Sequence, residues 1–162
     1  IIPFTTEEAW QSWREEIDGY ADLSCHLLRN QELPSNWNDK KLETNWKKIL
    51  ELREAFLFFH EKMRNAKQIK STMEADVCFF FKEKSFKDIA ELENLSEILI
   101  CSNVSISNVC DEEFEEFREN KNIHVKINKI DGYKCPRCWK IFKDEFKNEL
   151  CVRCEEVIDE TS

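Results

Sequence analysis

Apolar positions recur at helical spacing through the first 65 residues of the chain. After a start in which Thr5 and Glu8 are spaced as in a capping box, one apolar face is formed by Ala9, Trp10, Trp13 and Ile17. A longer stripe extends from residue 39 to residue 65 and comprises Leu42, Trp46, Ile49, Leu50, Arg53, Phe56, Leu57, His60 and Met63. This pattern predicts two helices, of which the second is the longest in the chain, joined by a connecting segment around Pro34.

Two polar residues interrupt the longer stripe. Arg53 and His60 occupy positions that the helical period assigns to the apolar face. Buried polar groups are usually hydrogen-bonded, so one interpretation is that neighbouring groups satisfy both side chains. The other interpretation is that they contact a polyanion, and the sequence leaves both open.

Beyond the second helix the pattern changes to a mixture of strands and helices. Three segments have the composition of strands: a continuous apolar run at 77–81, a second run at 98–106, and an alternating segment at 123–130. We expect the first to be covered on both faces of its sheet and the last to be half-buried. A short helix is predicted from Ser85, and the acidic segment 111–119 is expected to be the solvated face of another. Together these elements predict an α+β fold.

Composition limits the class of protein. With 162 residues, 41% of them hydrophobic and 12% aromatic, the chain can bury the core of one domain or of two small ones. Its net charge of −9 argues against binding nucleic acid over the whole surface, but leaves room for a local basic patch. The sequence has no run of eighteen apolar residues and no signal-peptide pattern, and its scattered cysteines suit a reducing compartment. We therefore expect a soluble, cytoplasmic protein.

The residues needed for several kinds of catalytic or nucleotide site are missing. Gly19 and Gly132 are the only glycines, which excludes glycine-rich phosphate loops because these need several. His26, His60 and His124 stand far apart, and no His/Asp/Ser or Cys/His catalytic arrangement is visible. The sequence therefore predicts a binding unit without catalytic residues of its own.

The strongest chemical signal is a pair of Cys-x-x-Cys motifs. Cys135 and Cys138 form the first motif, and Cys151 and Cys154 form the second. Two such turns facing each other supply the four thiolates of a tetrahedral zinc site. Because four thiolates fill every coordination position, the predicted Zn²⁺ is structural and not catalytic. Gly132 is expected to let the chain turn sharply into the first motif.

The chain around these motifs is locally basic. Between residues 121 and 154 there are nine basic and four acidic side chains, a net charge of +5 that falls to +3 when four thiolates hold one Zn²⁺. Such a patch can dock backbone phosphates, although a merely solvated surface is the alternative. Arg137 and Arg153 are expected to project outward, because they cannot point at a cation. Trp139 either stacks on an unpaired RNA base or covers the metal site against water.

Four stretches of the chain match motifs of one protein family and occur in the same order as in that family. They are Pro-Phe-Thr-Thr-Glu-Glu-Ala-Trp at 3–10, a Trp…Leu…Arg…Glu-x-x-Arg pattern between 46 and 64, the Met-Glu-Ala end of 69–75, and Gly-Tyr-Lys-Cys-Pro-Arg-Cys-Trp at 132–139 closed by Leu-Cys-Val-Arg-Cys at 150–154. On these motifs the chain resembles the C-terminal region of bacterial-type isoleucyl-tRNA synthetase, a class I aminoacyl-tRNA synthetase. One departure is Lys70, which stands where the family usually has a glycine and leaves the local backbone conformation open.

The resemblance implies a fragment of isoleucine–tRNA ligase that helps to dock tRNA. The parent enzyme would activate isoleucine with ATP and charge tRNA-Ile, using catalytic and editing domains upstream in the same polypeptide. The adenylate-forming signatures of such enzymes, His-x-Gly-His and Lys-Met-Ser-Lys-Ser, do not occur in these 162 residues. The fragment would bind tRNA-Ile at or near the anticodon stem-loop, as part of a cytoplasmic monomer without membrane contact, and would not charge tRNA alone.

The family's functional residues can be carried onto matching positions of this chain. The resemblance implies that one structural Zn²⁺ is bound by Cys135, Cys138, Cys151 and Cys154. Candidate tRNA contacts near this site are Arg137, Trp139, Lys140, Arg153, Lys143 and Lys134. Candidate tRNA contacts on the helical part are Arg53, Arg64 and Lys67.

The expected organisation has three parts. A helical segment of the anticodon-binding type, truncated at its start, covers residues 1–70, a small mixed α/β subdomain covers 71–130, and a zinc ribbon with a tail covers 131–162. Two other functions fit a ribbon of this kind: a DNA-binding finger of the glycosylase type, and a protein-interaction module whose basic patch meets an acidic partner. Equal affinity for any duplex DNA would favour the first alternative, and an absence of nucleic-acid binding would favour the second.

Overall fold

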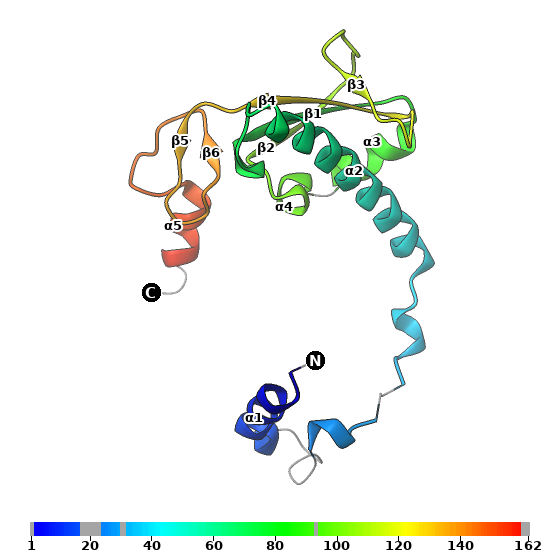
Figure 1. Cartoon of the computed structure of the whole chain (residues 1–162), viewed down its shortest axis with the longest axis vertical. Coiled ribbons are helices and arrows are strands. Elements are labelled where there is room, and N and C mark those ends of the chain that lie inside the picture. The colour runs from blue at the N-terminus through cyan, green and yellow to red at the C-terminus, as the bar shows by residue number, and fades with distance from the viewer. Residues whose placement is uncertain (1, 17–23, 30–31, 93, 160–162) are drawn as a thin grey trace. The chain divides into compact units, whose positions relative to one another are not determined.

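The structure of this chain is a computed structural model that describes residues 2–16, 24–29, 32–92 and 94–159 (Figure 1). The chain forms two compact units, Ile1–Asp39 and Lys40–Ser162. Ile17, expected on the apolar face of the first helix, lies outside the described residues.

Among its described residues, the first unit contains one α-helix and three short 3₁₀ turns. Helix α1 spans Pro3–Trp13, and the turns η1, η2 and η3 span Arg14–Glu16, Cys25–Leu27 and Ser35–Trp37. The expected capping box was wrong, because the helix starts earlier, with Ile2 at the cap and Pro3 in the first turn. Proline suits this position, since its fixed φ is helical and its missing N–H would have had no partner there.

Glu7 joins α1 to the η2 turn. Its carboxylate accepts hydrogen bonds from the Ser24 hydroxyl at 2.7 Å and from the Cys25 backbone N–H and thiol at 3.1 and 3.2 Å. The bond from Ser24, followed by those from Gln11 and Cys25, lowers the pKa of Glu7 to about 2. The His26 ring lies 3.0 Å from the Pro3 carbonyl oxygen. Because these groups already pair with one another, we interpret their contacts as structural: they hold the η2 turn against α1.

Helix α2 opens the second unit and spans Lys40–Asn65, close to its predicted bounds. Its buried side chains are Ile49, Leu52, Ala55, Phe56, Phe59 and His60. The predicted stripe therefore combined two faces of the helix, since Leu42, Trp46, Leu50 and Leu57 are exposed. Apolar residues occur on both faces of α2, and only packing against the sheet decides which face is inside.

The C-terminal end of α2 is closed by a left-handed residue. Lys67 has φ 58°, and its N–H bonds to the Arg64 carbonyl at 2.9 Å while the Gln68 N–H bonds to the Met63 carbonyl at 3.0 Å. This pair of bonds is the Schellman arrangement, in which glycine is usual at the left-handed position. Lys70, which replaces the family glycine, has no left-handed φ, so the backbone accommodates it without that strain.

A four-stranded sheet forms the centre of the second unit. The 3₁₀ turn η4 (Thr72–Glu74) leads into β1 (Ala75–Phe81), followed by α3 (Lys84–Leu92), α4 (Leu95–Leu99), β2 (Asn103–Ser107), β3 (Glu115–Glu116) and β4 (Ile123–Lys129). The strand order is β2-β1-β4-β3. Strand β1 pairs in parallel with β2 and antiparallel with β4, so that Val77 lies beside both Val104 and Ile127.

Two of the predicted elements were wrong. The expected strand at 98–106 begins only at Asn103, because Leu95 and Leu99 are buried from the short helix α4. The acidic segment 111–119 is not a helix, but contains β3 and turns. Here the Asp111 carboxylate accepts a bond from the Glu113 N–H, and Phe117 is buried. An aspartate that bonds to backbone two residues on favours a turn over a helix.

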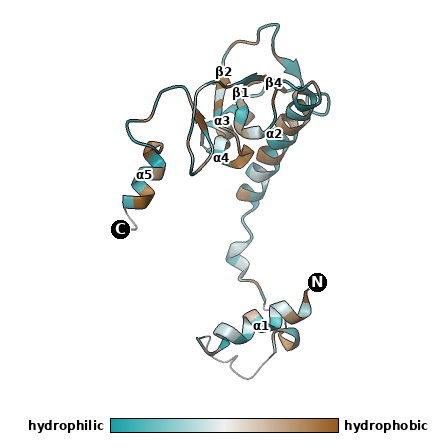
Figure 2. Cartoon of the chain, turned by 60° about the vertical axis from the view of Figure 1, so that its left-hand side comes forward, coloured by the Kyte–Doolittle hydropathy of each residue, from teal (hydrophilic) through white to brown (hydrophobic). Residues whose placement is uncertain are grey.

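The main core lies between the sheet and the helices α2, α3 and α4, which cover one of its faces (Figures 1 and 2). Its largest fully buried side chains include Phe56, Phe79 and Leu52. The other face of β1 is half-buried, with Phe80 packed edge-on against Phe114 and His124. The first strand is therefore fully covered on one face and not on both.

The final segment contains a second, smaller core. The hairpin β5–β6 (Tyr133–Lys134 and Ile141–Phe142) and helix α5 (Val152–Asp159) surround Cys135, Cys151 and Cys154. We call residues 131–159 the cysteine module and residues 40–130 the sheet subdomain. The predicted fold class is confirmed: helix and sheet are mixed, and the four cysteines are gathered into one cluster.

Helix α2 packs on the sheet and belongs to the same compact unit as residues 71–130. The functional division at residues 70 and 131 stays a prediction. Within the part of the chain that the structure describes, no helix has the length and apolar character needed to cross a membrane.

Candidate metal centre and nucleic-acid interface

The four cysteines of the two motifs converge on one point. The sulfur atoms of Cys135, Cys138, Cys151 and Cys154 all lie within 4.8 Å of one another, and Cys138 and Cys151 are 3.8 Å apart. Four sulfurs around a tetrahedral Zn²⁺ at about 2.3 Å are separated by about 3.8 Å. The cluster therefore has the donors and the spacing to hold a metal ion of this kind.

Local backbone structure brings each pair of cysteines together. In the first motif the Trp139 N–H bonds to the Cys135 carbonyl and the Cys135 N–H bonds to the Lys140 carbonyl, both at 2.9 Å. In the second, Cys151 directly precedes α5, and its carbonyl accepts a bond from the Cys154 N–H at 2.8 Å. Each motif thus forms a closed turn that presents two sulfurs to the same side.

Gly132 lies at a bend directly before β5, where the sequence predicted a turn. A Cβ at this position would lie 2.0 Å from the Phe142 carbonyl oxygen, and the glycine has no left-handed φ. The need for glycine therefore comes from the close approach of two backbones beside the β5–β6 hairpin, and not from a left-handed conformation.

The environment separates the pKa values of the thiols. Burial raises the pKa of Cys135, but hydrogen bonds from the backbone N–H groups of Cys138, Cys151 and Arg137 outweigh it and hold this pKa at about 6. Burial raises the pKa of Cys138, and it raises that of Cys151 to about 12. The backbone around Cys135 is therefore already arranged to stabilise a thiolate.

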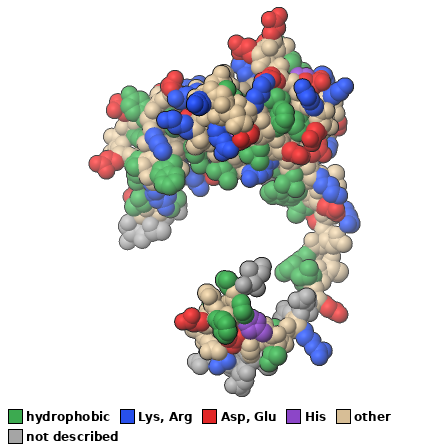
Figure 3. All heavy atoms as spheres, in the orientation of Figure 1, with side chains coloured by type: hydrophobic (Ala, Val, Ile, Leu, Met, Phe, Trp, Pro, Cys, Tyr) green, Lys and Arg blue, Asp and Glu red, His purple; other side chains and the backbone are tan. Residues whose placement is uncertain are grey.

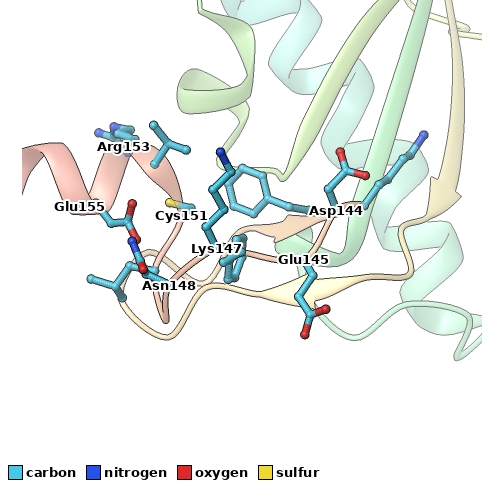
Figure 4. A pocket seen from close by; sticks show the side chains of 12 residues that line it. Asp144, Glu145, Lys147, Asn148, Cys151, Arg153 and Glu155 are labelled. Carbon is cyan, nitrogen blue, oxygen red and sulfur yellow. The ribbon is translucent and has the colours of Figure 1, made fainter.

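Apolar side chains cover the cluster on one side. Phe142, Phe146 and Leu150 pack against the cysteines, and the two phenylalanine rings meet edge-on at 5.4 Å. Beside them a hollow of about 420 Å³ opens between the loop 143–150 and α5 (Figure 4). Side chains of both signs line it, including Lys147 and Glu155, so the hollow has no clear preference for an anion.

Arg137 does not simply project into solvent. Its guanidinium donates a hydrogen bond to the Cys154 sulfur at 3.6 Å. The expectation that an arginine must avoid the metal site was wrong for this residue, because four thiolates around Zn²⁺ carry a net negative charge that a guanidinium can offset. Hydrogen bonds of this kind to the ligands orient and tune metal sites.

Trp139 and Lys134 form an exposed pair beside the cluster. The Trp139 side chain is 61% exposed, and the Lys134 ammonium lies 5.6 Å from the centre of its ring. The Trp139 backbone is left-handed, with φ 66°. The apolar cover of the cysteines comes from Phe142, Phe146 and Leu150, so Trp139 is open to a partner.

The other basic candidates of the module face the sheet subdomain. The Lys140 ammonium lies 2.8 Å from the Glu97 carboxylate, and the Arg153 guanidinium lies 3.4 Å from the same oxygen. Lys143 is exposed and 3.9 Å from the Asp76 carboxylate. The set of basic residues that the sequence treated as one patch is therefore divided. In one view of this unit, basic and acidic side chains are interspersed (Figure 3).

Arg53 and Arg64 bond to groups outside the cysteine module. Arg53 donates to the Ile98 carbonyl at 3.1 Å, which supports its interpretation as a satisfied polar group. Arg64 pairs with Glu61 at 2.9 Å, and Lys67 closes α2. His60 is buried against Phe56 with its Nε2 atom unbonded, so the same interpretation is wrong for that nitrogen.

Sequence reasoning missed the residues that receive the cysteine module. These are Ser96 and Glu97 of α4 and Ser102, which bond to Lys140 and to the Ile141 backbone. Ser102 lies in the range 98–106 that was expected to be a strand, and Ser96 and Glu97 lie just before it. Serine and glutamate are also common at helix surfaces, so these residues carry no distinctive signal. No pattern in the sequence links them to partners 39 to 44 positions away.

Curated relatives match almost the whole of this chain. Over 98% of its length it is 32% identical to the isoleucine–tRNA ligases of Brachyspira hyodysenteriae and Caldicellulosiruptor saccharolyticus, and 30% identical to that of Natranaerobius thermophilus. The chain spans only 17 to 18% of the length of these three proteins. No protein-family model matches the chain. The chain is therefore similar over nearly its whole length to a segment of isoleucine–tRNA ligases, consistent with their C-terminal region.

Proposed function

We propose that this chain is the tRNA-docking C-terminal region of an isoleucine–tRNA ligase. The observation that carries the proposal is an exposed tryptophan, Trp139, held beside four convergent cysteines in a chain whose relatives are isoleucine–tRNA ligases. The parent enzyme would activate isoleucine with ATP and join it to tRNA-Ile in the cytoplasm. Its catalytic and editing domains would be upstream of these residues, and the functional parts of the segment would divide at residues 70 and 131.

One Zn²⁺ held by Cys135, Cys138, Cys151 and Cys154 would have a structural role. Bound there, the ion supplies a cross-link between the two cysteine motifs and leaves no open position for a substrate. The chain's own residues do the rest: Phe142, Phe146 and Leu150 exclude water from one side, and Arg137 offsets the negative charge of the thiolates. The module is too small to fold on its apolar core alone, so metal binding and folding are expected to be one equilibrium.

Trp139 and Lys134 would form the RNA contact next to this site. A left-handed backbone costs an L-residue roughly 1–2 kcal/mol, and glycine would avoid the cost. A tryptophan kept in this conformation with most of its ring exposed is therefore explained by a role for the ring. An unpaired base can stack on it while the Lys134 ammonium meets a neighbouring phosphate. Arg137, close to the same turn, is a further candidate contact.

The first test is binding of labelled tRNA to the zinc-loaded chain by fluorescence anisotropy. We expect tRNA-Ile to bind more tightly than a tRNA with another anticodon and more tightly than duplex DNA. Affinity should fall as salt rises, because binding releases counterions from the phosphates. Equal affinity for any duplex DNA would favour a DNA-binding finger, and binding of no nucleic acid would contradict the proposal in favour of a protein-interaction module.

Trp139→Gly distinguishes stacking of the tryptophan on an RNA base from protection of the metal site against water. Stacking on aromatic side chains contributes roughly 1–3 kcal/mol per base, so this variant should bind tRNA-Ile about 5- to 150-fold more weakly. Zinc content should stay at one per chain, because glycine suits the left-handed position. The matched control is Val109→Gly, which removes an exposed apolar side chain of the sheet subdomain and should not change affinity. Loss of zinc in Trp139→Gly would instead show that the ring protects the metal site.

A further inference from the structure

Among the described contacts between the cysteine module and the sheet subdomain, Glu97 makes the shortest ion pair. Glu97, on the short helix α4, receives the Lys140 ammonium at 2.8 Å, and the neighbouring Ser96 hydroxyl lies 3.1 Å from the same nitrogen. The Lys140 side chain is only 13% exposed. A largely buried ammonium is costly to leave unpaired, so this contact is specific to the attached arrangement.

The same carboxylate oxygen reaches the second cysteine motif. Arg153 lies between Cys151 and Cys154, and its guanidinium is 3.4 Å from Glu97 Oε1. Lys140 follows Cys138 by two residues, so Glu97 meets one cation from each motif. These two cations lie together only when the motifs are held together. Attachment of the module is thereby coupled to the assembly of its four-cysteine cluster.

A second attachment uses neutral groups. The Ile141 backbone N–H donates to the Ser102 hydroxyl at 2.7 Å, and that hydroxyl donates to the Met73 carbonyl at 2.5 Å. This relay joins the start of β6 to the residues before β1. The first attachment joins the largely buried Lys140 ammonium to the exposed Glu97 carboxylate, and the second is partly buried. Two attachments of different chemistry fix an orientation better than one surface ion pair, which usually contributes little.

We propose that Glu97, supported by Ser96 and Ser102, is a positioning residue that fixes the cysteine module on the sheet subdomain, and that Lys140 and Arg153 serve this attachment and do not contact RNA. Trp139 and Lys140 are adjacent in sequence, yet one is exposed and the other is turned to Glu97. The attachment thus sets the direction in which Trp139 faces. This inference concerns packing within the chain and rests on the proposed function only for its RNA readout.

The test is Glu97→Gln in the zinc-loaded chain, followed by ¹⁵N relaxation. In the unchanged protein, the cysteine module and the sheet subdomain should share one rotational correlation time. In Glu97→Gln the module should keep one zinc per chain but tumble faster than the sheet subdomain. Lys140→Met should have the same effect. In the double variant the module should tumble no faster than in either single variant, because both changes remove the same contact. Glu61→Gln is the matched control, since its partner Arg64 is on the same helix.

The change in tRNA affinity distinguishes direct RNA contact of Lys140 or Arg153 from a positioning role of Glu97, because the two predict changes in opposite directions. Glu97→Gln removes a negative charge and frees two cations, so direct contact of Lys140 or Arg153 with RNA predicts tighter binding of tRNA-Ile. A positioning role predicts binding weaker by roughly 3- to 10-fold. Tighter binding, or a module that still tumbles with the sheet subdomain in Glu97→Gln, would overturn the proposal. If the unchanged chain binds no tRNA, the proposed function fails, while the relaxation data still decide the attachment.

Discussion

Three non-glycine residues in the described ranges have a left-handed backbone: Lys67, Ile100 and Trp139. Each closes a helix or a turn where glycine would be the usual choice. Ile100 is the most strained in principle, because a β-branched side chain fits this conformation poorly. It ends α4 directly after the segment that carries Glu97, with the Cys101 N–H bonded to the Ser96 carbonyl at 3.1 Å. The strained backbone of Ile100 therefore forms the C-terminal end of α4, the helix that carries Glu97.

Ile100→Gly is expected to stabilise the protein by up to about 1 kcal/mol. Glycine relieves a left-handed cost of roughly 1–2 kcal/mol, and its greater freedom in the unfolded chain offsets part of that gain. Chemical denaturation of the zinc-loaded chain measures the difference. Val109→Gly is the matched control, because Val109 is also an exposed β-branched residue but has no left-handed φ, so it should lose stability. A less stable Ile100→Gly variant would show that the side chain's contacts outweigh the backbone strain.

At the scale of elements, the protein contains two cores of different kinds. The core of the sheet subdomain is apolar and draws on α2, α3, α4 and the strands. The core of the cysteine module consists of cysteines with a few phenylalanine and leucine contacts. The first can fold by burying apolar surface, whereas the second needs a cross-link.

Cys151→Ser is expected to reduce zinc from one per chain to none and to unfold residues from about 131 to 156. The sheet subdomain should stay folded, because no residue of its apolar core comes from the module. Metal analysis and amide spectra of the two parts measure the two outcomes, and a strong chelator should reproduce both in the unchanged protein. Cys110→Ser, at an exposed free cysteine, is the control. One zinc per chain retained in Cys151→Ser would rule out the four-cysteine site.

At the scale of the whole molecule, the compact unit Ile1–Asp39 contributes nothing to either core within the described residues. All of the buried apolar side chains there come from positions between Ile49 and Cys154. Within the first unit, the described contacts between α1 and η2 are polar and include those of Glu7 with Ser24 and Cys25. The two units should therefore unfold independently.

A fragment of residues 40–162 is expected to fold, to bind one zinc and to unfold at the same denaturant midpoint as the full chain. The reason is that its two cores are complete without residues 1–39. A fragment of residues 75–162 is the control and should not fold, because it lacks Leu52, Phe56 and Phe59 of α2. Circular dichroism and zinc analysis compare the three chains. Failure of the 40–162 fragment to fold would mean that the first unit supports the second.

Short-range patterns in the sequence were sufficient for several features. The cysteine spacing predicted the cluster, because two residues between cysteines place both sulfurs in one turn. The helical period predicted α2, and strict alternation predicted β4. The motifs shared with isoleucine–tRNA ligases predicted a resemblance that the similarity to curated relatives confirmed.

Only the tertiary structure decided which side chains these elements bury and which they expose. Leu50 and Leu52 are equally apolar, but only Leu52 meets the sheet. Lys140 and Trp139 are neighbours in one turn. The Lys140 ammonium pairs with the Glu97 carboxylate, forty-three residues earlier, whereas the Trp139 ring is exposed. Sequence alone specified the local turns because they depend on neighbouring residues. It did not specify the division of the basic patch, because that depends on contacts between segments that are distant along the chain.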